Sequence, residues 1–141
     1  MTTDQSPLAV ALPAALSALH DDEGLYGVPV AVDTTVLYYD RRYVAQPVTT
    51  LDSLLAVATN GQFVEIGSAF VDAFWGVPAF GGQLFDAEQR VILDRGGFAN
   101  WLAWLKDARE TPGIILDSNR AALLQRFIND GVAYYVGNTA E

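Results

Sequence analysis

The sequence predicts an α/β domain in which a layered sheet is flanked by helices. Hydrophobic residues make up 51% and charged residues 18% of the 141 positions, which is typical of one globular core and excludes intrinsic disorder. Segments with apolar residues three and four positions apart alternate with short runs rich in valine and tyrosine. Because such alternation is typical of layered sheets, and no repeat or low-complexity linker divides the chain, we expect a single domain over 1–141.

The first part of the chain predicts a helix followed by extended structure. Residues 7–19 are rich in alanine and leucine, although Pro13 should kink this helix or delay its start. A polar turn at 20–24 completes this N-terminal helix and turn. Residues 25–32 and 34–39 then favour extended chain through their valine, tyrosine and threonine content, and Asp33 interrupts this apolar run.

A clear helix is predicted after Pro47. Thr50 can cap its start, Gly61 can end it, and a short strand over 62–66 should follow. Four apolar residues share one face of this helix: Leu51, Leu54, Leu55 and Ala58. After the strand we expect a second helix, ended or bent by Pro78, whose apolar stripe consists of Phe70, Phe74 and Val77.

The remaining chain predicts a hairpin, two helices and two strands. Residues 83–85 should pair with 90–93. The strongest helix follows Gly96 and Gly97, and its apolar residues are Phe98, Trp101, Leu102 and Leu105. A strand over 114–116 should precede a helix that begins at Asp117 or Ser118 and ends at Gly131; its inward residues are Leu124, Phe127 and Ile128. Residues 132–136 predict the last strand.

Composition excludes several classes of function. Eight basic residues against seventeen acidic ones give a net charge of -9, so the basic footprint that nucleic acids require is missing. The absence of cysteine excludes disulfides, thiolate chemistry and cysteine zinc sites. No glycine-rich phosphate motif, calcium-loop spacing or long apolar run occurs, so we expect no cofactor, metal or membrane span. The start, MTTDQSP, has no basic segment and predicts no signal peptide.

Individual residues leave binding and catalytic interpretations open. The carboxylate of Asp33 inside a β-forming run must be exposed, hydrogen-bonded or functional, although it could simply cap a bend. Trp75 could stack on a sugar face, but core packing explains it more simply. We expect Glu65 to be a surface or strand-edge residue. In a less favoured alternative, Glu65 and Asp33 form the carboxylate pair of a hydrolase. His20, the one histidine, lies in an acidic turn unsuited to a catalytic triad.

Several runs of the chain together form a recognisable pattern. They begin with LYGVPVAVDTTVLYYDRR at 25–42 and PVTTLDSLL at 47–55, and continue at 74–75, 81–86, 101–107 and 127–138. In order and spacing these runs resemble the sugar-type extracellular solute-binding proteins of ABC importers, such as maltose- and trehalose-binding proteins. The resemblance implies one lobe of a type II periplasmic-binding-protein-like fold, mainly the second lobe over 25–141. It also implies a non-enzymatic, extracytoplasmic protein whose partners are a sugar or oligosaccharide, the N-terminal lobe that should precede Met1, and a membrane permease.

The resemblance also implies a ligand site. Asp33 falls where the family places an acidic side chain that binds sugar hydroxyls, with Thr34 beside it. Ser68 and Phe70 fall in a strand-to-helix turn that faces the ligand, and Asn138 falls in the turn after a later strand. Phe70 or Trp75 would supply an apolar wall. Where maltose-binding relatives have a stacking tryptophan, this chain has Asn138-Thr139-Ala140. The resemblance therefore does not extend to the tryptophan on which a disaccharide stacks.

A single lobe should bind weakly because the other lobe supplies half of the contacts. Uncovered hinge surface and strand edges also predict a homodimer. The main alternative is a self-associating structural or interaction module that retains the lobe but binds no ligand, and a less favoured one is a two-carboxylate glycoside hydrolase that uses Asp33 and Glu65.

Overall fold

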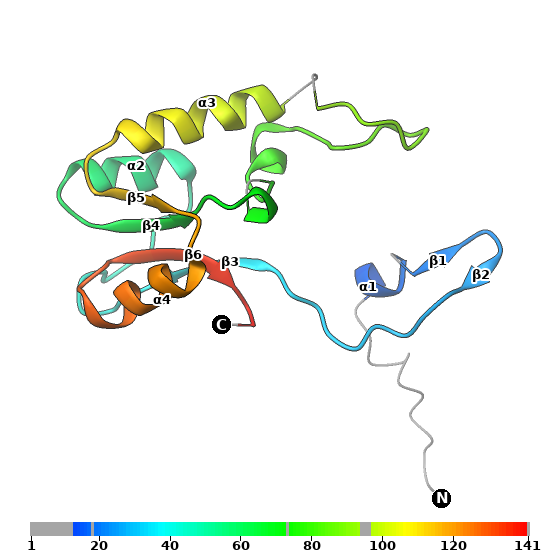
Figure 1. Ribbon diagram of the computed structural model, residues 1–141, viewed down its shortest axis with the longest axis horizontal. Coiled ribbons are helices and arrows are strands. Elements are labelled where there is room, and N and C mark those ends of the chain that lie inside the picture. Colours follow the sequence, from blue (N-terminus) through cyan, green and yellow to red (C-terminus); the bar gives the residue numbers. More distant parts are fainter. Residues whose placement is uncertain (1–12, 18, 73, 94–96, 141) are drawn as a thin grey trace, which may run out of the picture. The chain divides into compact units, whose positions relative to one another are not determined.

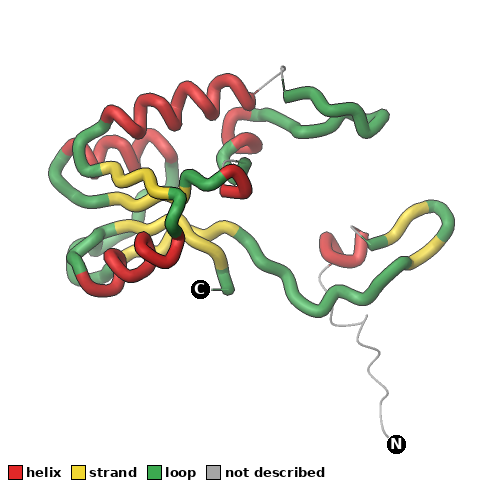
Figure 2. The backbone as a smooth tube through the Cα atoms, viewed as in Figure 1, coloured by secondary structure: helices red, strands yellow, loops and turns green. Residues whose placement is uncertain are grey.

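The computed structural model describes residues 13–17, 19–72, 74–93 and 97–140 (Figure 1). The chain divides into two units, one formed by 1–34 with Ala140 and the other by 35–139 with Glu141. The larger unit contains the four-stranded sheet and its helices, as the colouring by secondary structure makes plain (Figure 2). The predicted class of a sheet flanked by helices is therefore confirmed, whereas the extent of the single domain stays a prediction.

The first unit contains little regular structure. Helix α1 spans Pro13–Ser17, and strand β1 (His20–Asp21) pairs antiparallel with β2 (Gly24–Leu25). Helix α1 falls within the predicted 7–19 helix, most of which lies outside the described residues. No strand is assigned over 26–34, and its apolar side chains are exposed: Tyr26, Val28, Val30 and Val32.

The sheet of the second unit has the order β3-β6-β4-β5. Its strands are β3 (Thr35–Tyr39), β4 (Val64–Gly67), β5 (Ile114–Asp117) and β6 (Tyr134–Asn138). Strand β4 is central and parallel to both β5 and β6, whereas β3 is antiparallel to β6. All four strands fall on or beside the runs predicted as extended, each displaced by one or two residues at its ends.

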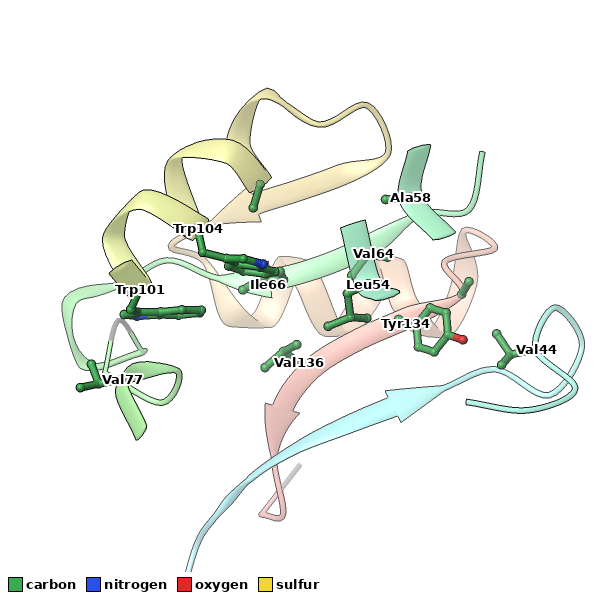
Figure 3. Packing of buried hydrophobic residues seen from close by; sticks show 12 residues of the cluster. Val44, Leu54, Ala58, Val64, Ile66, Val77, Trp101, Trp104, Tyr134 and Val136 are labelled. Atoms are coloured by element: carbon green, nitrogen blue, oxygen red, sulfur yellow. The ribbon is translucent and has the colours of Figure 1, made fainter. Parts of the chain in front are cut away.

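Helices cover both faces of this sheet (Figure 1). Helices α2 (Leu51–Thr59) and α3 (Gly97–Glu110) lie against one face, and α4 (Arg120–Asn129) lies against the other. On the first face, Ile66 and Val136 pack with the indole rings of α3 in the main core (Figure 3). Since side chains alternate along a strand, Glu65 of β4 points to the opposite face, toward α4.

The two best-defined helix starts use side-chain caps. Thr50 accepts a hydrogen bond from the amide of Ser53 at 3.2 Å, as its position before α2 predicts. The cap of α4 is Asn119, which accepts from the amide of Ala122 at 3.1 Å, and not Asp117 or Ser118. The carboxylate of Asp117 instead accepts from the amide of Asn119 at 2.9 Å, so it orients the cap.

The predicted helix after Gly67 is wrong. The structure has two short 3₁₀ turns there, η2 (Phe70–Asp72) and η3 (Val77–Phe80). Between them, Gly76 lies so close to the Trp101 ring that an added Cβ would stand 2.4 Å from it. The chain must pass this indole in an irregular path, and Pro78 at the start of η3 further opposes one continuous helix.

Three smaller expectations also need correction. The predicted hairpin is reduced, within the described residues, to one antiparallel bridge between Phe85 and Val91. In α4 the fully buried residue is Leu123, whereas Ile128 is 54% exposed. Glu65 is not a surface or strand-edge residue, because β4 lies between β5 and β6 and the Glu65 side chain is entirely buried.

Among the described helices, none has the length and hydrophobicity needed to cross a membrane.

Candidate functional site

The parallel strands bring polar residues to one edge of the sheet. Ser68 follows β4 directly, Asn138 ends β6, and Thr35 at the start of β3 pairs with Asn138. The amide of Ser68 donates to the carbonyl of Asp117 at 2.9 Å, which ties the ends of β4 and β5 together. Ligands of open α/β sheets bind outside the carboxyl ends of the strands, so this edge is the candidate site.

The η2 turn adds an exposed apolar surface beside this edge. Phe70 and Val71 are each 80% exposed. Behind them, Phe70 meets Phe74 edge to face at 5.1 Å, and Phe74 stacks on Phe98 at 5.9 Å. The exposed ring of Phe70 is thus supported from the core side and can offer its outer face to a ligand.

Trp75 occupies a different environment from Phe70. Its indole meets Trp101 at 4.7 Å with an interplanar angle of 67°, and Trp101 stacks in turn on Trp104 at 5.1 Å. Trp75 is half-buried and packs against the main core. Core packing therefore accounts for Trp75, which agrees with the simpler of its two interpretations.

Asp33 and Thr34 belong to the first unit, and both side chains are exposed. They precede Thr35 in the chain, but the structure does not place them relative to the sheet. Within the second unit, the structure gathers Ser68 and Asn138 at the carboxyl edge, with Phe70 in the turn that follows.

An ion-pair network supports the sheet from the α4 face. Arg126 donates through Nε to Glu65 at 2.6 Å and through Nη2 to Asp117 at 3.1 Å. Burial raises the pKa of Glu65 above its ordinary value, although the hydrogen bond from Arg126 opposes this effect. The pKa of Asp117 is lowered, first by the amide of Asn119 and then by Arg126. Glu65 is thus enclosed in a structural pair and is not available to a two-carboxylate mechanism.

A second ion pair, which was not predicted, lies at the carboxyl edge itself. The carboxylate of Asp72 in η2 is buried, and its Oδ1 lies 2.6 Å from Nη2 of Arg120, the first residue of α4. Forty-eight positions separate the partners in the printed sequence. No local spacing indicates such a pair, so sequence reasoning had no signal for it.

In the described part of the second unit, hollows occur beside strand β5 and at the start of α2. One of about 550 Å³ is lined by Ser68, Arg109, Ile114, Ile115 and Leu116, along strand β5. The other, of about 350 Å³, is lined by residues 49–52 with Ala79 and Phe80, at the start of α2. Ser68 is the one predicted site residue that lines either of them. Among the described residues, no group of three His, Cys, Asp or Glu side chains could hold a metal ion.

Comparisons with known proteins bear on this geometry. The family model of bacterial extracellular solute-binding proteins matches residues 1–141. Among solved structures, the chain is similar to the GacH receptor of Streptomyces glaucescens GLA.O, with a TM-score of 0.75 and 20% identity. That receptor was determined unliganded and in complex with acarbose and an acarbose homolog. The match covers 96% of this chain but 39% of the receptor, and no curated protein matches.

Proposed function

Because this chain belongs to the bacterial extracellular solute-binding proteins, we propose that it is a non-enzymatic lobe that binds a sugar or oligosaccharide. The observation that carries the proposal is the carboxyl edge of the sheet, where Ser68 and Asn138 lie and the exposed Phe70 follows. The fold similarity to a receptor that binds acarbose supports the same class of ligand. Family membership implies an extracytoplasmic location.

The side chains at this edge suit a carbohydrate. The hydroxyl of Ser68 and the amide of Asn138 can exchange hydrogen bonds with sugar hydroxyls. The ring of Phe70 suits the apolar C–H face of a pyranose, because aromatic rings combine a large apolar surface with a defined orientation. Trp75 would contribute mainly by packing behind the site. In the first unit, Asp33 and Thr34 are proposed in their own right as a hydroxyl-accepting carboxylate and a hydroxyl for the sugar.

The proposal assigns to this chain one lobe of a two-lobed site. The chain spans 39% of the length of the GacH receptor. In a two-lobed binding protein, closure of the second lobe desolvates the ligand and adds contacts. For one lobe alone we expect at best about millimolar affinity, or roughly 4 kcal/mol.

Calorimetric titration with maltose, acarbose and a panel of monosaccharides tests this proposal. Phe70→Ala and Ser68→Ala should each weaken binding at least about threefold, since each removes a direct contact. Phe63→Ala is the matched control, because Phe63 is a 50% exposed aromatic residue that precedes β4 at the opposite edge. Asp33→Ala tests the first unit separately. A titration in which no sugar binds, or in which Phe63→Ala weakens binding as much as Phe70→Ala, would refute the site.

The second candidate is a self-associating interaction module. The observation that favours it is the run of exposed apolar side chains in the first unit, including Val28, Val30 and Val32, since such runs mark interaction surfaces. Its partner would be a second copy of the chain, or the first lobe and permease of a longer relative. Light scattering at increasing concentration distinguishes the candidates: a concentration-dependent dimer that ignores every sugar supports the module.

A further inference from the structure

The Asp72 carboxylate is buried within the most exposed apolar turn of the second unit. Asp72 itself is 7% exposed, while its neighbours Phe70 and Val71 are each 80% exposed. Its Oδ1 lies 2.6 Å from Nη2 of Arg120, and its Oδ2 has no hydrogen-bond partner among the described residues. The turn therefore places a charged group inside and two apolar groups outside, which reverses the usual preference.

The pair of Asp72 and Arg120 connects two elements at the carboxyl edge. Asp72 ends η2, and Arg120 is the first residue of α4. The start of α4 is itself held by the cap Asn119. Gly67 permits the close approach of the turn, because a Cβ there would stand 3.0 Å from Oδ2 of Asp72.

A buried ion pair contributes little net stability but can fix one arrangement over others. The alternative arrangement here would turn Phe70 and Val71 inward and Asp72 outward. From this geometry we propose that Asp72 and Arg120 are positioning residues of the sugar site, which hold η2 so that Phe70 and Val71 face the ligand. This inference rests on the proposed function, and neither residue is required to touch the sugar.

A double-mutant cycle tests whether Arg120 acts through Phe70. Arg120→Gln should weaken binding of acarbose or maltose about tenfold in the wild-type background but less than about twofold in the Phe70→Ala background, because linked residues give non-additive effects. Arg120→Lys should restore most of the affinity, and Asp72→Asn should reproduce the loss. The matched control is Arg42→Gln, which breaks the exposed pair of Arg42 with Asp40, the residue that follows β3.

Hydrogen exchange separates failure of this inference from failure of the proposed function. The amide of Asp72 donates to the carbonyl of Ala69 at 2.9 Å within the turn. Its exchange should accelerate at least about tenfold in Arg120→Gln and stay unchanged in Arg42→Gln, whether or not sugar binds. Equal losses of affinity in both Phe70 backgrounds, or unchanged exchange at Asp72 in a folded Arg120→Gln protein, would overturn the inference. If no sugar binds while exchange accelerates, the positioning pair stands and the proposed ligand is wrong.

Discussion

Replacing Arg126 with methionine tests the energetic role of the buried Glu65. The substitution keeps an unbranched, largely apolar side chain but leaves the fully buried carboxylate without its donor, which lies at 2.6 Å. A lone buried charge either persists at high cost or takes up a proton. Protonation at pH 7 costs about 3.4 kcal/mol, because the ordinary pKa of 4.5 lies about 2.5 pH units lower and each unit is worth about 1.4 kcal/mol. We therefore expect Arg126→Met to lower the free energy of unfolding by about 3 kcal/mol at pH 7.

The same argument fixes how this loss depends on pH. Burial already raises the folded-state pKa of Glu65, so its contribution to stability is fully present below 4.5 and is lost as the pH rises through the raised value. Without Arg126, its hydrogen bond and its charge no longer lower the pKa of Glu65. The stability lost at neutral pH therefore becomes larger. The difference in the free energy of unfolding between wild type and Arg126→Met should thus shrink toward pH 4.5.

Urea denaturation followed by tryptophan fluorescence measures this difference, since Trp101 and Trp104 are buried in the same unit. Arg90→Met is the matched control, because Arg90 pairs with Asp86 at the surface and its loss should produce no resolvable change. The double variant Glu65→Leu with Arg126→Met should recover most of the lost stability, since it removes the buried charge itself. A loss of equal size at pH 5 and pH 7, or no recovery in the double variant, would refute the reasoning.

Five further substitutions, at four positions, probe the fold. Gly76→Ala should lower the free energy of unfolding by about 1 to 3 kcal/mol, because the methyl group overlaps the Trp101 ring; an unchanged thermal midpoint would contradict this. Asn119→Ala should cost about 1 kcal/mol by removing the cap of α4, and Asn119→Asp should retain most of it in the same urea titration. Leu123→Ala should lower the free energy of unfolding by about 2 to 5 kcal/mol, because Leu123 is fully buried. Ile128→Ala, on the exposed side of α4, should change it by less than about 1 kcal/mol. Similar effects at both positions would show that the buried face of α4 is misassigned.

Elements with a strong local pattern could be predicted from the sequence. Helix α2 combines a threonine cap, apolar residues at helical spacing and a terminal glycine, and the structure contains it over Leu51–Thr59. The run around Phe70, Phe74 and Val77 has the same spacing but forms two short turns. The contact that prevents a continuous helix is between Gly76 and Trp101, which lies twenty-five positions later in the printed sequence. The spacing of apolar residues within a short segment does not predict such a long-range contact.

Charged residues were harder to place than apolar ones for the same reason. Glu65 looked like an edge residue because a carboxylate is rarely buried alone. Its burial depends on Arg126, which is 61 positions away and reaches it from the other side of the α4–sheet interface. For the candidate site, the residues after strand ends could be identified through the family resemblance, whereas the pair of Asp72 and Arg120 could not be identified without the fold.

The two aromatic residues predicted as alternatives for an apolar wall lie in different environments. The ring of Trp75 lies 4.7 Å from that of Trp101 and is part of the packing around the core. Phe70 is 80% exposed although its ring meets that of Phe74 at 5.1 Å. Exposing Phe70 and Val71 together while burying Asp72 runs against the hydrophobic effect, so packing alone does not account for the η2 turn. In the proposed function, a ligand that covers Phe70 would supply the missing apolar contact, and for this reason the proposed binding surface includes the turn and not the tryptophan cluster.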